Sequence, residues 1–203
     1  AITSETPIKA TLVSSEPGLQ IYSCTGTPCD CVKIACHAIV PRTPDLIVGG
    51  INHGDNSAVN AHYSGTMGVV MEGCMKGIPS IAFSLCNHDA DADFAPTYDV
   101  IRKVVAKVLE RGLPYGSCLN VNFPDVPEYK GVKVCRQAYG TWVNEWESHN
   151  HPRGGQWWWL TGEFRIDDTD ENSDRVALNN GYVAITPTKI DLTDYTLLED
   201  MKE

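Results

Sequence analysis

Two short segments carry groups that could bind a phosphate or a metal ion. Asn52 follows the apolar run 45–51, and its amide oxygen suits a hard cation such as Mg²⁺ or Mn²⁺. Ser64, Gly65 and Thr66 precede an apolar helical pattern, where free N–H groups and the helix dipole favour an anion. Each signal is weak alone, because Asn52 could be a turn residue and Ser64 only an N-cap.

Other sequence patterns that resemble catalytic or metal-binding motifs lack essential residues of those motifs. The acidic run 88–93 resembles the opening of a calcium loop, but Phe94 and Val100 stand where that loop needs Gly and Glu. A nucleophile elbow, a phosphate-binding Walker loop and a zinc-binding His-Glu-x-x-His helix are not found in the sequence. The eight cysteines are expected to be reduced thiols, several of them within apolar stretches.

Alternating strand and helix patterns must position Asn52 and Ser64. Strands are predicted at 45–51, 80–85 and 119–123, with helices at about 64–76 and 100–112 between them. This order predicts an α/β fold with a mostly parallel sheet. Ligands bind such sheets at the carboxyl ends of the strands, where the polar loop 52–63 is expected.

The flanking regions have a different character. A hairpin is predicted over 8–14 and 19–24, a helix over 27–40, a short helix near 174–179, a strand over 182–186 and then a polar tail. Aromatic residues alternate over 141–166, which predicts a projecting β arm that buries them against another subunit. The alternative is an edge hairpin that covers its own domain.

Composition favours one folded, water-soluble domain. The 203 residues are 42% hydrophobic and 21% charged, with a net charge of −10 that opposes binding to a nucleic-acid polymer. No apolar run approaches the roughly 20 residues that span a bilayer, and the first residues lack a signal-peptide pattern. We therefore expect no membrane association and a cytoplasmic location.

Several segments together resemble the SurE family of 5'/3'-nucleotidases. They are residues 44–54 (PDLIVGGINHG) with Asn56, 63–68 (YSGTMG) with Glu72 and Gly73, 26–28 (GTP) with 30–32 (DCV), 119–124 (LNVNFP), and Asp174 with 177–178, 181–183, 185–187 and 191–193. Their order matches the family over about residues 26–193. The resemblance implies a Rossmann-like α/β domain over 1–203, with 132–170 forming a C-terminal β-hairpin arm for oligomerisation.

The sequence departs from the family pattern at two levels. Gly49 stands where Ser is common, Ala58 where Gly is usual and Asn60 where Asp is usual. Family members also open with a strand that ends in two metal-binding acids, followed later by a further Ser ligand, and neither segment is present. We therefore expect a domain that is incomplete at its N-terminus, with Asn52 as the one family metal ligand in the sequence.

The resemblance implies a metal-dependent phosphomonoesterase acting on nucleoside 5'- and 3'-monophosphates. Asn52 would bind Mg²⁺ or Mn²⁺ and share the catalytic role with Ser64, while Ser64, Gly65 and Thr66 hold the phosphate. A homodimer or homotetramer through the β arm is implied. The alternatives are a broader phosphatase or exopolyphosphatase on the same site, or a non-catalytic nucleotide-binding or assembly protein.

Overall fold

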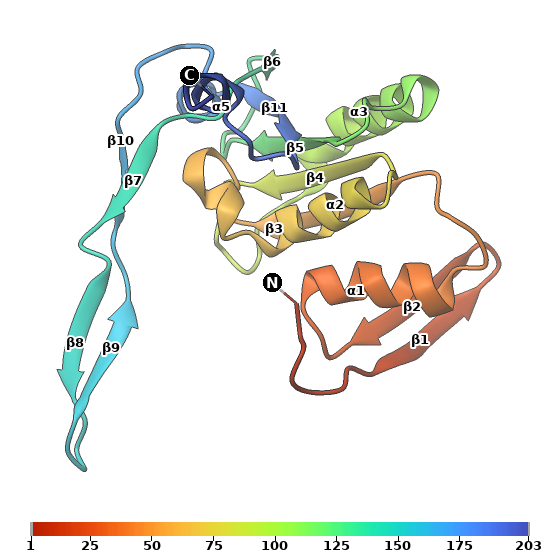
Figure 1. Cartoon of the computed structure of the whole chain (residues 1–203), viewed down its shortest axis with the longest axis horizontal. Helices are drawn as coiled ribbons and strands as arrows, with labels where there is room; N and C mark the ends of the chain where they lie inside the picture. The colour runs from red at the N-terminus through yellow and green to blue at the C-terminus, as the bar shows by residue number, and fades with distance from the viewer. Residues whose placement is uncertain (1, 203) are drawn as a thin grey trace.

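A five-stranded mixed sheet forms the centre of the molecule (Figure 1). The computed structural model describes residues 2–202, so Ala1 and Glu203, the two ends of the predicted domain, lie outside the described residues. The strands in sheet order are β3 (Ile47–His53), β4 (Ser80–Leu85), β5 (Ser117–Phe123), β11 (Val183–Lys189) and β6 (Val132–Val134).

Two helical crossovers make the first three strands parallel. The chain passes from β3 through α2 (Gly65–Met75) to β4, and then through α3 (Tyr98–Arg111) to β5. β3 pairs parallel with β4, and β4 with β5, while β11 runs antiparallel to β5 and parallel to β6. The predicted α/β fold with a mostly parallel sheet is confirmed.

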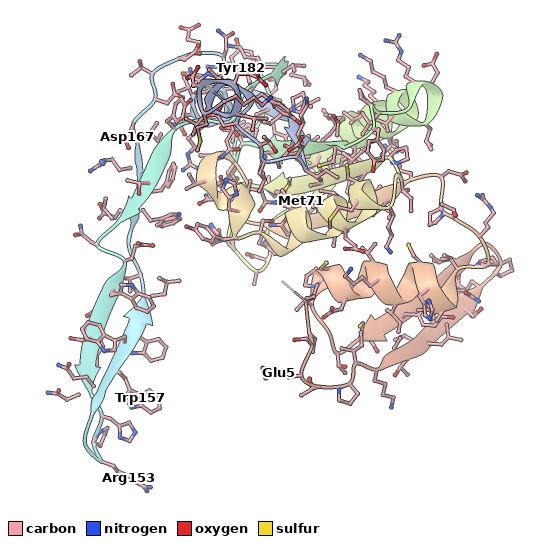
Figure 2. The ribbon with its side chains drawn as sticks, in the orientation of Figure 1. Glu5, Met71, Arg153, Trp157, Asp167 and Tyr182 are labelled. Carbon is pink, nitrogen blue, oxygen red and sulfur yellow. The ribbon has the colours of Figure 1, made fainter. Side chains whose placement is uncertain are left out.

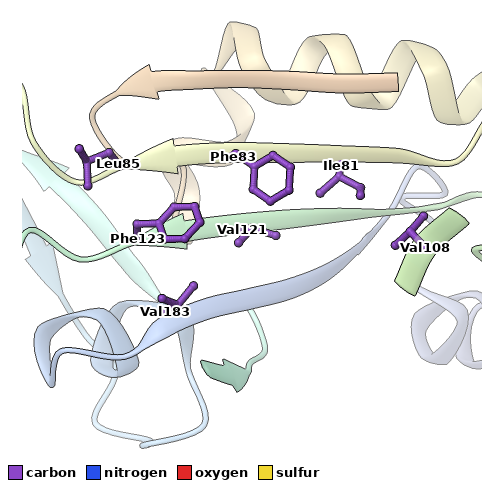
Figure 3. Close-up of a cluster of buried hydrophobic side chains, with 7 residues drawn as sticks. All are labelled: Ile81, Phe83, Leu85, Val108, Val121, Phe123 and Val183. Carbon is purple, nitrogen blue, oxygen red and sulfur yellow. The ribbon is translucent and has the colours of Figure 1, made fainter. Parts of the chain in front are cut away.

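The two faces of the sheet are covered by different helices because side chains alternate along each strand. One face packs against α3 and forms an apolar cluster of Ile81, Phe83, Leu85, Val108, Val121, Phe123 and Val183 (Figure 3). The opposite face packs against α2, through small and polar β4 residues such as Ala82 and Ser84. The polar groups of the candidate site therefore lie on the α2 face.

The N-terminal part adds a hairpin and a helix beside α2. β1 (Ala10–Glu16) pairs antiparallel with β2 (Leu19–Cys24), as predicted. α1 (Pro28–Ile34) begins after Thr27, which forms a reciprocal capping box with Asp30, and continues as a π-helical turn over Ala35–Ile39. Buried Glu72 of α2 pairs with Lys33 of α1 at 2.9 Å, which fixes α1 against α2.

A narrow β arm extends away from the sheet (Figure 1). At its base, β7 (Gly140–Val143) pairs with β10 (Glu163–Ile166), and further out β8 (Trp146–Asn150) pairs with β9 (Gln156–Leu160). Figure 2 shows Trp157 on the outer ribbon and Arg153 at its tip. The predicted projecting arm is confirmed, and β6, at the start of the range predicted for it, pairs within the main sheet.

The C-terminal region differs from the prediction in one element. α4 (Asp174–Asn179) matches the predicted helix, but the predicted polar tail contains a further helix, α5 (Tyr195–Asp200). Asp194 caps α5 by accepting hydrogen bonds from the backbone N–H groups of Thr196 and Leu197, and this N-cap residue is a helix start signal within the predicted tail. Within residues 2–202, none of the helices has the length and apolar character needed to cross a bilayer.

Two short 3-10 turns complete the connections. They are Ala58–His62, in the loop after β3, and Ala95–Thr97, which leads into α3.

Candidate functional site

Strand register places three polar side chains in one row across the sheet. Asn52 of β3 is opposite Ser84 of β4, and Ser84 is opposite Asn122 of β5. All three residues come near the carboxyl ends of parallel strands, where these folds bind ligands. The predicted position of Asn52 at such an end is confirmed.

The amide group of Asn52 is held at both ends. Its Oδ1 accepts hydrogen bonds from Thr66 Oγ1 at 2.9 Å and Ser84 Oγ at 2.7 Å. Its Nδ2 donates to the carbonyl oxygens of His53 at 2.8 Å and Gly54 at 3.1 Å. Asn52 and Thr66, 14 residues apart in the chain, are therefore brought together with their oxygens facing each other.

A second set of amides anchors the loop that follows Asn52. The backbone N–H of Asn56 donates to Asn122 Oδ1 at 2.7 Å, and the Asn56 carbonyl accepts from Asn120 Nδ2 at 2.8 Å. Asn56 Nδ2 also donates to the hydroxyl of Ser84. All four of these residues are buried, so their mutual hydrogen bonds replace those to water.

Ser84, Asn120 and Asn122 belong to the site but were not predicted as site residues. The available signal was polar residues on one face of strands that are otherwise apolar: Asn120 and Asn122 are two positions apart, and Ser84 is within 80–85. A buried polar residue needs a partner, and here each partner belongs to the site.

Ser64 and Gly65 form the start of α2. Ser64 Oγ accepts a hydrogen bond from the backbone N–H of Met67 at 3.0 Å, so Ser64 is the N-cap of this helix. A Cβ atom at Gly65 would lie 2.9 Å from Cγ of Pro28, which gives this glycine a packing role against α1. Thr66, in the same first turn, bonds to Asn52, so the start of α2 adjoins the polar row.

One partly buried and one fully buried carboxylate, Asp55 and Asp174, hold the loop 52–63 to the C-terminal region. Asp55 Oδ2 pairs with Arg175 Nη1 at 2.6 Å. Burial alone would raise the pKa of Asp55, but hydrogen bonds from Ser57 and the Arg175 guanidinium outweigh it and lower that pKa below its ordinary value. Asp174 accepts the backbone N–H of Ala58 at 3.1 Å, and burial raises the pKa of Asp174 despite its hydrogen bonds.

Ala58 has a φ of 50°, in the left-handed region where glycine is favoured. The resemblance to the SurE family implied Gly at this position, and the Ala that stands there has a strained backbone conformation. The hydrogen bond from Ala58 to Asp174 helps to hold that conformation.

The described residues have the right donor type for a hard cation but do not complete its coordination shell. The Asn52 oxygen accepts hydrogen bonds from two hydroxyl groups and, at 3.4 Å, from the Asn56 amide nitrogen, and amide and hydroxyl oxygens are ligands that suit Mg²⁺ or Mn²⁺. Binding a cation there requires that Thr66 or Ser84 turn its hydroxyl hydrogen away. Among residues 2–202, no group of three or more His, Cys, Asp or Glu side chains could hold a metal ion.

A cavity of about 820 Å³ opens beside Ser64. It extends from the loop 52–63 to the base of the β arm, and its lining includes Tyr63, Trp142, Glu145, Glu163, Phe164 and Arg175. The site therefore combines a helix start, an oriented amide oxygen and a space large enough for an organic group.

Comparisons with known proteins give one consistent family. Residues 1–144 match the family model described as Survival protein SurE. The 5'-nucleotidase SurE of Phocaeicola vulgatus is 60% identical over 203 residues, which are 100% of this chain and 79% of that protein. The 5'-nucleotidase SurE of Bacteroides thetaiotaomicron is 58% identical over 202 residues, 99% of this chain and 78% of that protein. The crystal structure of the SurE protein from Aquifex aeolicus superposes with a TM-score of 0.82 at 35% identity, covering 100% of this chain and 81% of that one.

Proposed function

The chain belongs to the SurE family, and we propose that it acts as a metal-dependent 5'-nucleotidase that also accepts 3'-monophosphates. The products would be a nucleoside and inorganic phosphate. The observation that carries this proposal is the hydrogen bond between Asn52 and Thr66, which joins the strand-end amide to the first turn of α2. The relatives named 5'-nucleotidase SurE support the same activity.

In this proposal the phosphate lies at the start of α2. The first N–H groups of a helix have no acceptor within the helix, and the α2 dipole directs positive potential toward the same point. Gly65 and Thr66 would donate backbone hydrogen bonds to the phosphate oxygens, and Ser64 would keep this first turn in place as its cap. These groups would stabilise charge that develops on the phosphoryl oxygens during hydrolysis.

Asn52 would hold a Mg²⁺ or Mn²⁺ ion through its side-chain oxygen Oδ1. A bound divalent ion supplies Lewis acidity and lowers the pKa of a bound water. The row of Ser84, Asn56 and Asn122 would orient the Asn52 oxygen, since an outer shell of hydrogen bonds fixes a metal ligand.

A phosphate-release assay on the complete protein tests the proposal. Adenosine 5'- and 3'-monophosphate, a short polyphosphate and a simple aryl phosphate would be compared with and without Mg²⁺ or Mn²⁺. Faster metal-dependent release from the nucleotides supports the proposal. Equal or faster release from polyphosphate would favour the broader phosphatase, and nucleotide binding without release would favour the non-catalytic alternative.

Asn52→Ala in the complete protein should reduce kcat by roughly 100-fold or more, because the site loses an oriented oxygen. The metal concentration that gives half-maximal activity should also rise. Asn179→Ala is the matched control, because Asn179 is exposed at the end of α4. Normal activity of Asn52→Ala at limiting metal would remove Asn52 from the site.

The proposal also includes a cytoplasmic homodimer or homotetramer that assembles through the β arm. All eight cysteines are free thiols, a state that the reducing cytoplasm maintains. The exposed tryptophans of the outer ribbon support an assembly role for the arm.

A further inference from the structure

We infer that His88 is a general acid that protonates the ester oxygen of the leaving group as the phosphate is released. The inference rests on the proposed nucleotidase function and adds a catalytic residue to it. His88 follows β4, the strand beside Asn52, so both groups come from neighbouring strand ends. No motif in the sequence distinguishes His88 from the other five histidines.

The structure distinguishes the six histidines, all within residues 2–202, by their position relative to the cavity beside Ser64. His88 lines that cavity together with Ser64 itself. The lining of this cavity does not include the other five: His37, His53, His62, His149 and His151. A phosphate at the start of α2 would lie at Ser64, so its ester oxygen can face the space that His88 borders.

Contacts between the ends of β3 and β4 fix the place of His88. The backbone N–H of Gly54 donates to the carbonyl oxygen of Asn87 at 3.0 Å, which joins the loop after β3 to the loop after β4. A Cβ atom at Gly54 would lie 2.5 Å from Cε1 of His88, so the ring lies directly on this glycine. The carbonyl oxygen of Gly54 accepts the side-chain amide of Asn52 at 3.1 Å. One residue, Gly54, therefore separates the His88 imidazole from the proposed metal ligand.

The imidazole of His88 is available to donate a proton. His88 is exposed, and within the described part of the chain its ring nitrogens have no hydrogen-bond or ion-pair partner. Histidine is the side chain most often used as a general acid, because imidazole exchanges protons near neutral pH.

Other groups in the cavity lining are less suited to this role. Asp55 is paired with Arg175 at 2.6 Å, and its lowered pKa keeps the carboxylate ionised at neutral pH. Glu145 and Glu163 come from the β arm and not from the strand ends of the site. The hydroxyl of Tyr63 is the competing proton donor in this lining.

The proposed step conserves protons and electrons. A water molecule attacks phosphorus and keeps one hydrogen in the new P–O–H group, while its other proton passes to solvent. The bond between phosphorus and the ester oxygen breaks, and the electron pair stays on that oxygen. Protonated His88 gives its N–H proton to the same oxygen, so the nucleoside leaves as an alcohol, and solvent reprotonates the neutral imidazole. The leaving group therefore carries no negative charge, which is the stabilisation that a general acid provides.

The test compares two leaving groups in the complete protein. His88→Gln should lower kcat for adenosine 5'-monophosphate by roughly 100-fold but kcat for 4-nitrophenyl phosphate by no more than about threefold, because nitrophenolate leaves as a stable anion without a proton. Added imidazole should restore part of the nucleotide activity of His88→Ala, because it can enter the space left by the side chain. A purely structural role would affect both substrates alike and would not respond to imidazole.

Two further variants provide the controls. His62→Gln should leave both kcat values unchanged, because His62 is exposed in the same loop region and outside the cavity lining. Tyr63→Phe tests the competing donor. A loss confined to the nucleotide in Tyr63→Phe, but not in His88→Gln, would overturn the assignment of His88. An equal loss for both substrates in His88→Gln, or no loss, would overturn it as well.

A binding measurement separates this inference from the proposed function. Histidine-selective NMR on the complete protein without added metal should show that adenosine 5'-monophosphate shifts the His88 ring signals and leaves those of His62 in place. This result does not depend on hydrolysis. Unshifted His88 signals at saturating nucleotide would overturn the inference, whereas absence of phosphate release from every substrate in the wild type would overturn the proposed activity itself.

Discussion

Gly65 has two possible roles at the start of α2, and they can be separated. A Cβ atom there would lie 2.9 Å from Pro28 Cγ, so Gly65→Ala should destabilise the protein by about 1–2 kcal/mol through overpacking between α1 and α2. The same variant should raise KM for the nucleotide if the phosphate approaches this backbone. Thermal unfolding and steady-state kinetics measure the two effects.

The double variant Pro28→Ala with Gly65→Ala distinguishes the roles. Removal of the proline ring should recover most of the lost stability, because the crowded atom is gone. KM should stay raised if residue 65 contacts the phosphate. Recovery of both stability and KM would show that Gly65 is needed only for packing.

Asp55 should make the stability of the loop 52–63 depend on pH. Its pKa is lowered in the folded state from the ordinary 3.8, so its stabilising effect is present above that value and is lost as the pH falls through the lowered pKa. Asp55→Asn should therefore cost about 1–2 kcal/mol at neutral pH, where the paired Arg175 loses its counter-charge. That difference from wild type should shrink below about pH 4.

Chemical denaturation at several pH values measures this effect. Asp99→Asn is the matched control, because the Asp99 side chain is 84% exposed and its pair with Arg102 should contribute little at any pH. A constant difference between wild type and Asp55→Asn from neutral pH to below pH 3 would show that the carboxylate charge is not involved.

At the scale of elements, the sequence predicted where the strands are but not which residues face one another. Asn52 was placed at a strand end because an apolar run precedes it. Ser84 lies beside Asn52 because of the register in which β3 pairs with β4. That register depends on contacts between distant segments of the chain. The same reason explains why Asn122, a third member of the row, had no predicted role.

α1 and the β arm, at the edges of the molecule, show what a local sequence pattern can and cannot predict. α1 was predictable from Thr27 and Pro28, because a capping box is a local interaction. The pairing of Trp142 with Asn60 spans 82 positions and brings the arm to the site, and no periodicity in the sequence indicates it. The family resemblance predicted site residues at 52 and 64–66, whereas the cavity beside them required the three-dimensional structure.

At the scale of the whole molecule, the outer ribbon of the arm is the part least explained by the single chain. Adjacent strand residues face opposite sides, so Trp157 and Trp159 lie on one face and Trp158 on the other, and all three are exposed. A two-stranded ribbon is marginal in water by itself. Apolar side chains on both faces therefore favour a second copy of the chain as the cover.

Removing the outer ribbon should shift the protein toward a monomer. Deletion of residues 145–161 joins Asn144 to Gly162, whose φ angles of 55° and 108° are already positive. Val143 and Glu163 remain paired, so the new connection is a two-residue Asn-Gly loop, the preferred type for a tight hairpin. Sedimentation velocity should then show a smaller species, with the sheet and the core unchanged by circular dichroism.

A substitution variant provides the control for this deletion. Trp157→Ser with Trp159→Ser removes apolar area from one face of the ribbon while leaving its length and the cavity lining intact. It should weaken assembly less than the deletion does, because Trp158 and Leu160 remain exposed on the other face. An unchanged oligomer in both variants would show that the arm is not the principal interface. A monomeric deletion variant with an unchanged oligomer in the double substitution would place the interface on the face that carries Trp158.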